Sequence, residues 1–201
     1  MSLTLIPYPT RWNEIPGWTC PRITELYCEV AARYRSGVFV EVGVAYGCSL
    51  SFLASVADPA VRLLGVDLWQ TFQGQDNLDP ELFALARSHR SPIDACRSFL
   101  DATGAARAEL VQGLSFDVPK WLDVQADFVF VDACHDYEPV RDDVRAWLPR
   151  LKPGGTIAGH DINAHYPGVE RAVRELLPDA EIRPPGPTAN GWGGVWVWRK
   201  P

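Results

Sequence analysis

A strand–turn–helix pattern near residue 40 constrains this chain more than any other feature. An apolar run over 38–42 contains a single acid, Glu41, and leads into Gly43 and Gly47. Apolar residues then return at helical spacing over 48–57, so the pattern predicts a buried strand, a tight turn and a helix. Glycine lets the backbone turn sharply and lets a ligand approach closely, because it has no Cβ.

A second acid stands where a ribose would need it. The apolar run over 61–67 predicts another strand, and it ends in Asp67. A carboxylate roughly 20 residues or more after a glycine turn is placed to hold the two hydroxyls of a ribose. Glu41, at the end of the first strand, is placed to accept hydrogen bonds from ligand hydroxyls or an amino group. Together these residues predict a cofactor that contains a nucleoside.

The glycine spacing distinguishes between the candidate cofactors. A dinucleotide site requires G-x-G-x-x-G, because the pyrophosphate rests on bare backbone. Here the spacing is G-x-x-x-G, with Ala45 in place of a middle glycine, and the Glu41 carboxylate would repel a pyrophosphate. The stretch resembles the first motif of class I S-adenosylmethionine-dependent methyltransferases, whose cofactor has a cationic amino-acid end. A strand-to-helix turn that binds nothing is the alternative for this motif taken alone.

Strand and helix patterns alternate along the rest of the chain. We predict helices over 21–35, 80–90, 92–104, 140–148 and 169–177, further strands over 108–112, 127–132, 156–159, around 182 and over 195–198, and a turn over 152–155. Strands that read as apolar runs and alternate with helices are typical of a parallel sheet covered on both faces. We therefore expect one domain over 1–201, with an N-terminal segment and helix over 1–37.

Ligands of such sheets bind at the carboxyl ends of the strands. Asp132 follows the predicted strand over 127–131, and His160 and Asp161 follow the next one. Adjacent parallel strands would bring these three side chains within reach of one another. His135 lies three residues beyond Asp132 and joins the same candidate site.

The region from Asp127 to Asp161 carries a more specific resemblance. It is similar to a bacterial small-molecule subfamily of class I methyltransferases with a Gly-His-Asp motif after strand five, and the likeness extends over about 36–178. The residues that carry it are Asp132, His135, Tyr137, Asp143, Trp147-Leu148-Pro149, Leu151 to Gly155, Gly159-His160-Asp161, Gly168-Val169 and Ala172-Val173. The resemblance implies a Rossmann-like, doubly wound α/β fold of three layers, whose seven-stranded, mostly parallel sheet has an antiparallel last strand over 195–199.

The resemblance also implies which residues meet S-adenosylmethionine. Glu41 and Gly43 would face the amino-acid end, Asp67 the ribose, and the stretch 113–115 the adenine. The full set of expected cofactor contacts is Glu41, Gly43, Gly47, Ser49, Asp67, Leu68, Gly113, Ser115 and Asp132.

Related O-methyltransferases hold a divalent metal after strands four and five, and the matching positions here are Asp132, His160 and Asp161. His160 replaces a carboxylate of that pattern. Mg²⁺ prefers oxygen ligands, whereas an imidazole suits Mn, Fe, Ni or Zn better, so a divalent metal, Mg²⁺ or Mn²⁺, stays an open expectation. We expect Asp132, His135, His160 and Asp161 to form the catalytic site, with either histidine as the base. The plainer alternatives are a backbone contact for Asp132, a turn cap for Asp161, an orienting role for His160 and packing of His135 beneath Tyr137.

Composition excludes several classes of function. The net charge of −6 argues against a dedicated nucleic-acid binder, which needs a basic face. No run approaches the roughly 18 apolar residues of a membrane span, and residues 1–9 lack the features of a secretory signal. Five scattered cysteines favour reduced thiols, so we expect a cytoplasmic protein. The sequence does not fix the oligomeric state, and a homodimer is one of the open alternatives.

The sequence therefore predicts O-methylation of a small-molecule acceptor such as a sugar or natural-product hydroxyl. An NAD-dependent oxidoreductase and a non-catalytic cofactor-binding or partner-binding domain are the alternatives. The segment over 68–91 is longer than a usual connection, and we expect it to cover the active site. The acceptor itself would be chosen by this segment and by the loop over 185–194, which contains Trp192.

Overall fold

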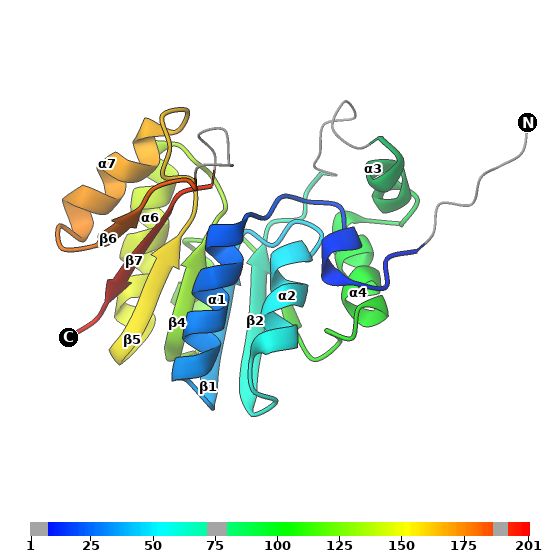
Figure 1. The fold of residues 1–201 in the computed structure, drawn as a ribbon, viewed down its shortest axis with the longest axis horizontal. Coiled ribbons are helices and arrows are strands. Elements are labelled where there is room, and N and C mark those ends of the chain that lie inside the picture. Colours follow the sequence, from blue (N-terminus) through cyan, green and yellow to red (C-terminus); the bar gives the residue numbers. More distant parts are fainter. Residues whose placement is uncertain (1–7, 72–79, 187–192) are drawn as a thin grey trace, which may run out of the picture.

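The computed structural model describes residues 8–71, 80–186 and 193–201. Within them, seven strands form one sheet in the order β3-β2-β1-β4-β5-β7-β6 (Figure 1). The strands are β1 Gly37–Val42, β2 Val61–Asp67, β3 Glu109–Gln112, β4 Ala126–Val131, β5 Leu151–Gly159, β6 Glu181–Arg183 and β7 Val195–Arg199. β1 to β5 pair in parallel, and β7 runs antiparallel to both β5 and β6. The predicted fold class is confirmed.

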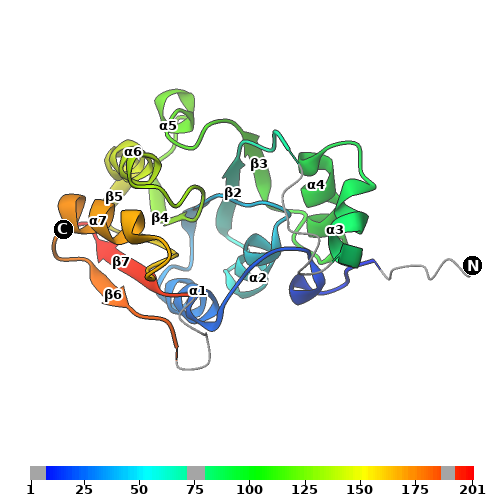
Figure 2. The ribbon, with the colours of Figure 1, turned by 90° about the horizontal axis from the view of Figure 1, so that it is seen from above.

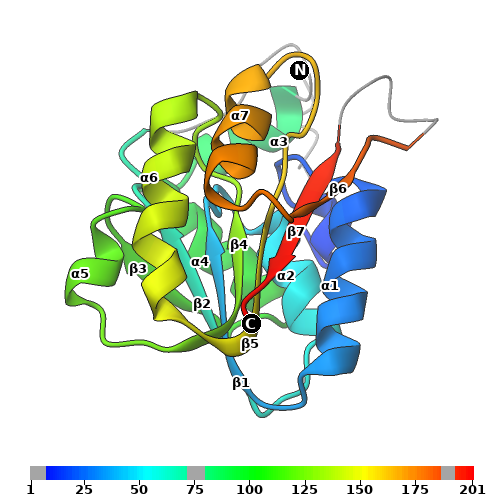
Figure 3. The same ribbon diagram turned by 90° about the vertical axis from the view of Figure 1, so that its left-hand side faces the viewer.

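Helices cover both faces of this sheet (Figures 2 and 3). They are α1 Pro21–Arg33, α2 Cys48–Val56, α3 Pro80–Arg87, α4 Pro92–Ala102, α5 Val118–Trp121, α6 Tyr137–Trp147 and α7 Pro167–Leu176, with short 3₁₀ turns at Trp12–Glu14 and Leu148–Arg150. Side chains of α1, α2 and α4 form one core with the sheet, and side chains of α5, α6 and α7 form another on the opposite face.

The local sequence explains where the helices begin and what they bury. Pro21 and Pro92 occupy the first helical positions of α1 and α4, where a missing N–H costs nothing. The Ser91 hydroxyl caps α4 by accepting a hydrogen bond from the Asp94 N–H at 3.3 Å. In α1 the buried side chains recur at helical spacing and face the sheet; they are Ile23, Leu26, Tyr27, Val30 and Ala31.

A third apolar cluster joins the N-terminal segment and α3 to the glycine turn. Ile15, Tyr46, Phe83 and Phe99 are buried in it. The ring of Tyr46 lies 6.2 Å from that of Phe83 on α3 and 6.4 Å from that of Phe99 on α4. Part of the segment expected to cover the active site is therefore packed against the turn. The rest of it, over 72–79, lies outside the described residues, as does Trp192.

The turn predicted over 152–155 is wrong, because these residues belong to β5. A shift in register between Ala126 and Phe128 of the partner strand accommodates them. The Gly154 N–H donates to the Lys200 carbonyl at 3.0 Å, and the Lys200 N–H donates to the Gly155 carbonyl at 2.9 Å. Pairing with a segment distant in sequence thus overrides a local Pro-Gly-Gly turn signal.

Candidate active site

The carboxylate of Asp67 organises the glycine turn. One of its oxygens accepts the backbone N–H groups of Val44 and Ala45, each at 2.9 Å, and the other accepts the N–H of Trp69 at 3.0 Å. The side chain is nearly buried, with 9% exposed. A carboxylate has about four acceptor positions, so three contacts leave Asp67 capacity for a ligand hydroxyl.

Strained backbone gathers at this edge of the sheet. Among the described residues, three that are not glycine have positive φ: Ala45 at 48°, Trp69 at 42° and Asp161 at 61°. The indole N–H of Trp69 donates to the Ala45 carbonyl at 2.7 Å, which ties two of the three together. Such conformations cost about 1–3 kcal/mol each and persist where the surroundings hold them, often at functional sites.

Glu41 lies fully buried beneath the turn, and neither of its oxygens is free. Tyr27 donates its hydroxyl to one oxygen and Ser49 donates its hydroxyl to the other, each at 2.7 Å. Burial raises the pKa of Glu41 to about 8, against the opposing effect of these two hydrogen bonds. Direct contact of Glu41 or Ser49 with a cofactor stays a prediction, because in this structure they contact each other.

Gly43 brings the turn against the end of β4. Its φ is 88°, and a Cβ at this position would lie 2.0 Å from the Asp132 carbonyl oxygen. No other residue fits there without moving the backbone. The Asp132 N–H in turn donates to the Val42 carbonyl at 2.7 Å. The expected cofactor turn and the expected catalytic acid therefore share one backbone contact.

Two histidines and two carboxylates meet beside that contact, as the parallel pairing of β4 with β5 predicts. His135 Nε2 lies 2.8 Å from an Asp161 oxygen and 3.9 Å from an Asp132 oxygen. His160 Nδ1 lies 3.5 Å from Asp132 and 3.3 Å from Asp161. The four predicted catalytic residues are thus in mutual reach.

These four groups stabilise one another's charged forms. Burial opposes protonation of both histidines, but the Asp161 carboxylate at 2.8 Å and the nearby charge of Asp132 raise the pKa of His135 to about 10. The charge of Asp132, with hydrogen bonds to both carboxylates, raises the pKa of His160 to about 12. Burial also disfavours both carboxylates, yet the histidines hold the pKa of Asp132 and that of Asp161 below their ordinary values.

The sequence analysis missed some neighbours of this cluster. Cys20, at the start of α1, lies with its sulfur 3.4 Å from His160 Nε2 and donates to the Gly193 carbonyl at 3.3 Å. The His135 ring stacks on Tyr166, with centroids 4.4 Å apart, rather than beneath Tyr137. An odd, isolated cysteine carries no signal in sequence that would have marked it as a partner of a histidine.

The donor atoms can also accommodate a metal ion. One ligand atom each from Asp132, His135 and Asp161 lies within 4.8 Å of the others. His160, which the resemblance placed in the ligand set, faces the same two carboxylates, but its Nε2 is directed toward Cys20. The structure therefore adds His135 to the expected set.

The remaining expected cofactor residues border the same edge. The Gly113 N–H donates to the Asp67 carbonyl at 2.9 Å, so the loop after β3 begins beside Asp67. The Leu68 carbonyl accepts the Gln112 side-chain amide at 3.0 Å. Gly47 precedes α2 with φ of 92°. Ser115 lies further along the loop, where its carbonyl accepts the indole N–H of Trp147 at 3.1 Å.

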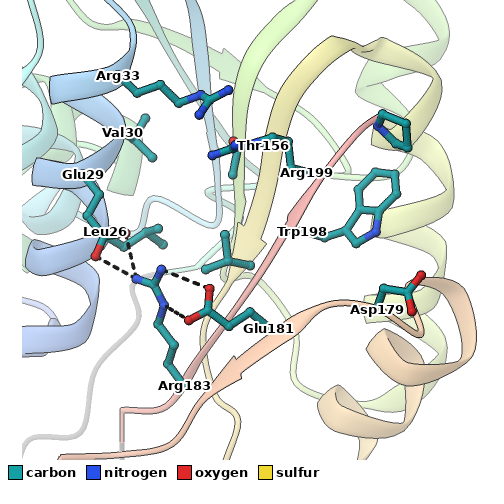
Figure 4. A pocket seen from close by; sticks show the side chains of 12 residues that line it. Leu26, Glu29, Val30, Arg33, Thr156, Asp179, Glu181, Arg183, Trp198 and Arg199 are labelled. Atoms are coloured by element: carbon teal, nitrogen blue, oxygen red, sulfur yellow. Dashed lines mark hydrogen bonds and ion pairs between the residues drawn. The ribbon is translucent and has the colours of Figure 1, made fainter.

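A separate groove of about 470 Å³ lies between α1 and the antiparallel edge of the sheet (Figure 4). Arg183 stands at its rim and pairs with Glu29 and Glu181, each at 2.9 Å. The groove contains none of the candidate catalytic or cofactor residues. It is therefore distinct from the site at the carboxyl ends of the strands.

The chain has an α/β fold with a glycine turn and an acidic cluster at the carboxyl edge of its sheet, and comparison with known proteins identifies the family. A family model described as a methyltransferase domain matches residues 40–162, more than half of the chain. The chain belongs to this methyltransferase-domain family.

Individual relatives support the same fold. An O-methyltransferase from Bacillus cereus in complex with S-adenosylhomocysteine is 17% identical, with a TM-score of 0.68, over 98% of this chain and 94% of that one. The O-methyltransferase TomG from Streptomyces achromogenes, in complex with S-adenosylmethionine, is 20% identical, with a TM-score of 0.68, over 92% and 82%. An uncharacterized protein, y4gI, from Sinorhizobium fredii is 29% identical over 150 residues, which are 72% of this chain and 15% of that protein.

None of the helices in the described residues has the length and apolar character that crossing a bilayer requires.

Proposed function

We propose that this protein is an S-adenosylmethionine-dependent O-methyltransferase that acts on a small molecule. The observation that carries the proposal is the junction at Gly43, where the turn organised by Asp67 meets the cluster of Asp132, His135, His160 and Asp161. A cofactor held on the turn would present its reactive carbon toward an acceptor held at the cluster. The sulfonium cofactor, when bound, supplies an electrophilic methyl group.

The protein's own contribution is then alignment of the acceptor and removal of its proton. Asp161 contacts both histidines and fixes the orientation of their rings. An imidazole takes the acceptor proton only in its neutral form. Because the pKa of His135 is raised to about 10, turnover should rise with pH up to about that value. His135, about a third exposed, is more accessible to an acceptor than His160, which is 12% exposed. We therefore assign the proton transfer to His135 and an orienting role to His160.

A small molecule is the acceptor that the charge of the chain favours. The net charge of −6 disfavours RNA or DNA, whose phosphates require a basic surface. The structural neighbour TomG is involved in tomaymycin synthesis, and a sugar or natural-product hydroxyl is the acceptor class that we propose here. We further propose that the protein has no membrane or nucleic-acid partner.

Calorimetry with two ligands tests the proposed class. S-adenosylhomocysteine is expected to bind with micromolar affinity, on the order of 8 kcal/mol, and NAD is expected not to bind. The missing middle glycine is the physical reason, because a pyrophosphate rests on bare backbone and Ala45 stands at that position. Binding of NAD in preference to S-adenosylhomocysteine would establish the oxidoreductase alternative. Binding of neither would favour a non-catalytic domain.

As an alternative to a histidine base, Asp132, His135 and Asp161 would hold a divalent metal, and the metal would then lower the pKa of an acceptor hydroxyl. This mixed set of nitrogen and oxygen donors predicts tighter binding of Mn²⁺ than of Mg²⁺. The metal-free protein can be titrated with Mn²⁺, and the decrease in the EPR signal of free Mn²⁺ then measures the binding affinity. Asp161→Ala and His135→Ala are expected to weaken binding by at least tenfold. If Mn²⁺ binding were lost in His160→Ala but kept in His135→Ala, the ligand set that the resemblance implied would be supported instead.

A further inference from the structure

Asp143 is a buried acid that the proposed mechanism does not use. It lies on α6 with none of its surface exposed. Among the described residues, no group makes a hydrogen bond to either of its carboxylate oxygens. Buried polar groups nearly always have partners, because a buried acceptor without a donor loses the hydrogen bonds that it made to water. A residue that breaks this rule calls for a functional explanation.

The surroundings of Asp143 point to the loop after β3. Trp147 lies one helical turn further along α6, so both side chains share the buried face of the helix. The Trp147 indole N–H holds the Ser115 carbonyl at 3.1 Å. Burial raises the pKa of Asp143 to about 7, and the Ser115 side chain opposes this rise. Ser115 is thus close to the carboxylate without being in hydrogen-bonding geometry.

The same loop begins at the cofactor turn. Its first residue, Gly113, donates its N–H to the Asp67 carbonyl at 2.9 Å. Two residues later the chain reaches Ser115, whose carbonyl is held by Trp147 on the face of α6 that also carries Asp143. The loop is therefore attached at one end to the acid proposed for the ribose, and at the other end it is near a buried acceptor that has no donor among the described residues.

We propose that Asp143 is a positioning residue for the adenine end of the cofactor: it accepts the Ser115 hydroxyl when the loop over 113–115 closes on the adenine ring. The inference rests on the proposed function, because it requires a cofactor that contains adenine. It assigns Asp143 no contact with the cofactor itself. The unpaired carboxylate is the feature that the closed loop would satisfy.

Binding of two ligands to matched variants tests this assignment. S-adenosylhomocysteine and 5′-methylthioadenosine share the adenosine end, but only the first has the amino-acid end. Asp143→Leu removes the hydrogen-bond acceptor and keeps a side chain of similar volume. It is expected to weaken the binding of both ligands by the same factor, about tenfold. Asp143→Asn keeps one acceptor oxygen and should restore part of the loss. Asp142→Asn, on the same helix, is the control and should bind both ligands within twofold of the parent.

Ser115→Ala provides a second variant that does not depend on the folding of Asp143→Leu. It should weaken the binding of both ligands as much as Asp143→Leu does. The double variant should lose no more affinity than either single variant, because the two residues act through each other. A merely structural role for Asp143 would instead give additive losses with Ser115→Ala.

The outcomes separate this inference from the function on which it rests. If the parent protein binds both ligands and the affinities of Asp143→Leu and Ser115→Ala are the same as those of the parent, the inference is overturned but the proposed function is not. A loss confined to S-adenosylhomocysteine would also overturn it, because the effect would then lie at the amino-acid end. Parent protein that binds neither ligand would overturn the proposed function and the inference with it.

Discussion

Replacing Asp161 by asparagine is expected to lower methyl transfer by about 10²–10⁴-fold, the range for loss of acid–base catalysis, while the Kd for S-adenosylhomocysteine stays within twofold. Among the described residues, Asp161 is the one carboxylate within 3.3 Å of both histidines, so its charge fixes their orientation and protonation. Asparagine tolerates the positive φ of 61° at this position. The change therefore removes the charge with little strain on the backbone.

Histidine NMR gives a readout of this variant that needs no acceptor. The chain has four histidines, and the parent should show pKa values of about 10 for His135 and about 12 for His160, against an ordinary value of 6.5. Loss of the neighbouring negative charge should lower both by about 1 to 3. Turnover can be followed as S-adenosylhomocysteine release over a panel of phenols and sugar hydroxyls.

Asp179→Asn, in the exposed loop before β6, is the matched control and should leave turnover and both histidine pKa values as in the parent. If Asp161→Asn retained full turnover with unchanged histidine titrations, the cluster would have no part in catalysis. A fall in histidine pKa values without a fall in turnover would assign the cluster to structure alone.

The elements at the site could be predicted from sequence because each has a local signal. The strand ending at Asp67 is predicted to the residue, and the pairing of β4 with β5 brings Asp132 to His160 and Asp161 as parallel neighbours must. These inferences need only periodicity and the rule that parallel strands share a carboxyl edge. The turn after β1 follows from its two glycines in the same way.

What could not be predicted are the contacts between residues far apart in the chain. Tyr27 has the spacing of a core residue on α1, yet its hydroxyl holds Glu41. Cys20 reaches His160 across 140 positions of sequence. Asp143 stands beside Asp142, and a pair of acids in a helix usually indicates a solvated face. Helical spacing with Val140 and Trp147 nevertheless places it on the buried face.

Asp67 has a predicted contact with a ligand and, in addition, a structural task that the sequence does not indicate. Sequence spacing indicates a ribose contact, and the structure adds three backbone N–H groups that the same carboxylate accepts. A residue that only held a ribose would matter to the loaded protein alone. A residue that also holds the turn matters to the empty protein as well, and these two cases can be separated by experiment.

Asp67→Ala is expected to lower the free energy of unfolding of the cofactor-free protein by about 3–5 kcal/mol. Each hydrogen bond to a charged acceptor contributes about 1.5–3 kcal/mol, and the losses overlap because the three donors lie on one turn. The variant also releases the positive-φ conformations of Ala45 and Trp69, which returns about 1–3 kcal/mol each and keeps the net loss below the sum of the three bonds. Urea denaturation followed by circular dichroism measures it.

The same variant is expected to bind S-adenosylhomocysteine at least a hundredfold more weakly, since it loses both the proposed ribose contact and the shape of the turn. About 1.4 kcal/mol corresponds to each factor of ten, so two lost interactions suffice. Asp67→Asn keeps one acceptor oxygen and should fall between Asp67→Ala and the parent in both measurements. Asp101 is an exposed acid on α4, and Asp101→Ala, as the control, should change neither the free energy of unfolding nor the affinity for S-adenosylhomocysteine. Weak binding with unaltered stability would restrict Asp67 to the ribose, and parental binding with reduced stability would restrict it to the turn.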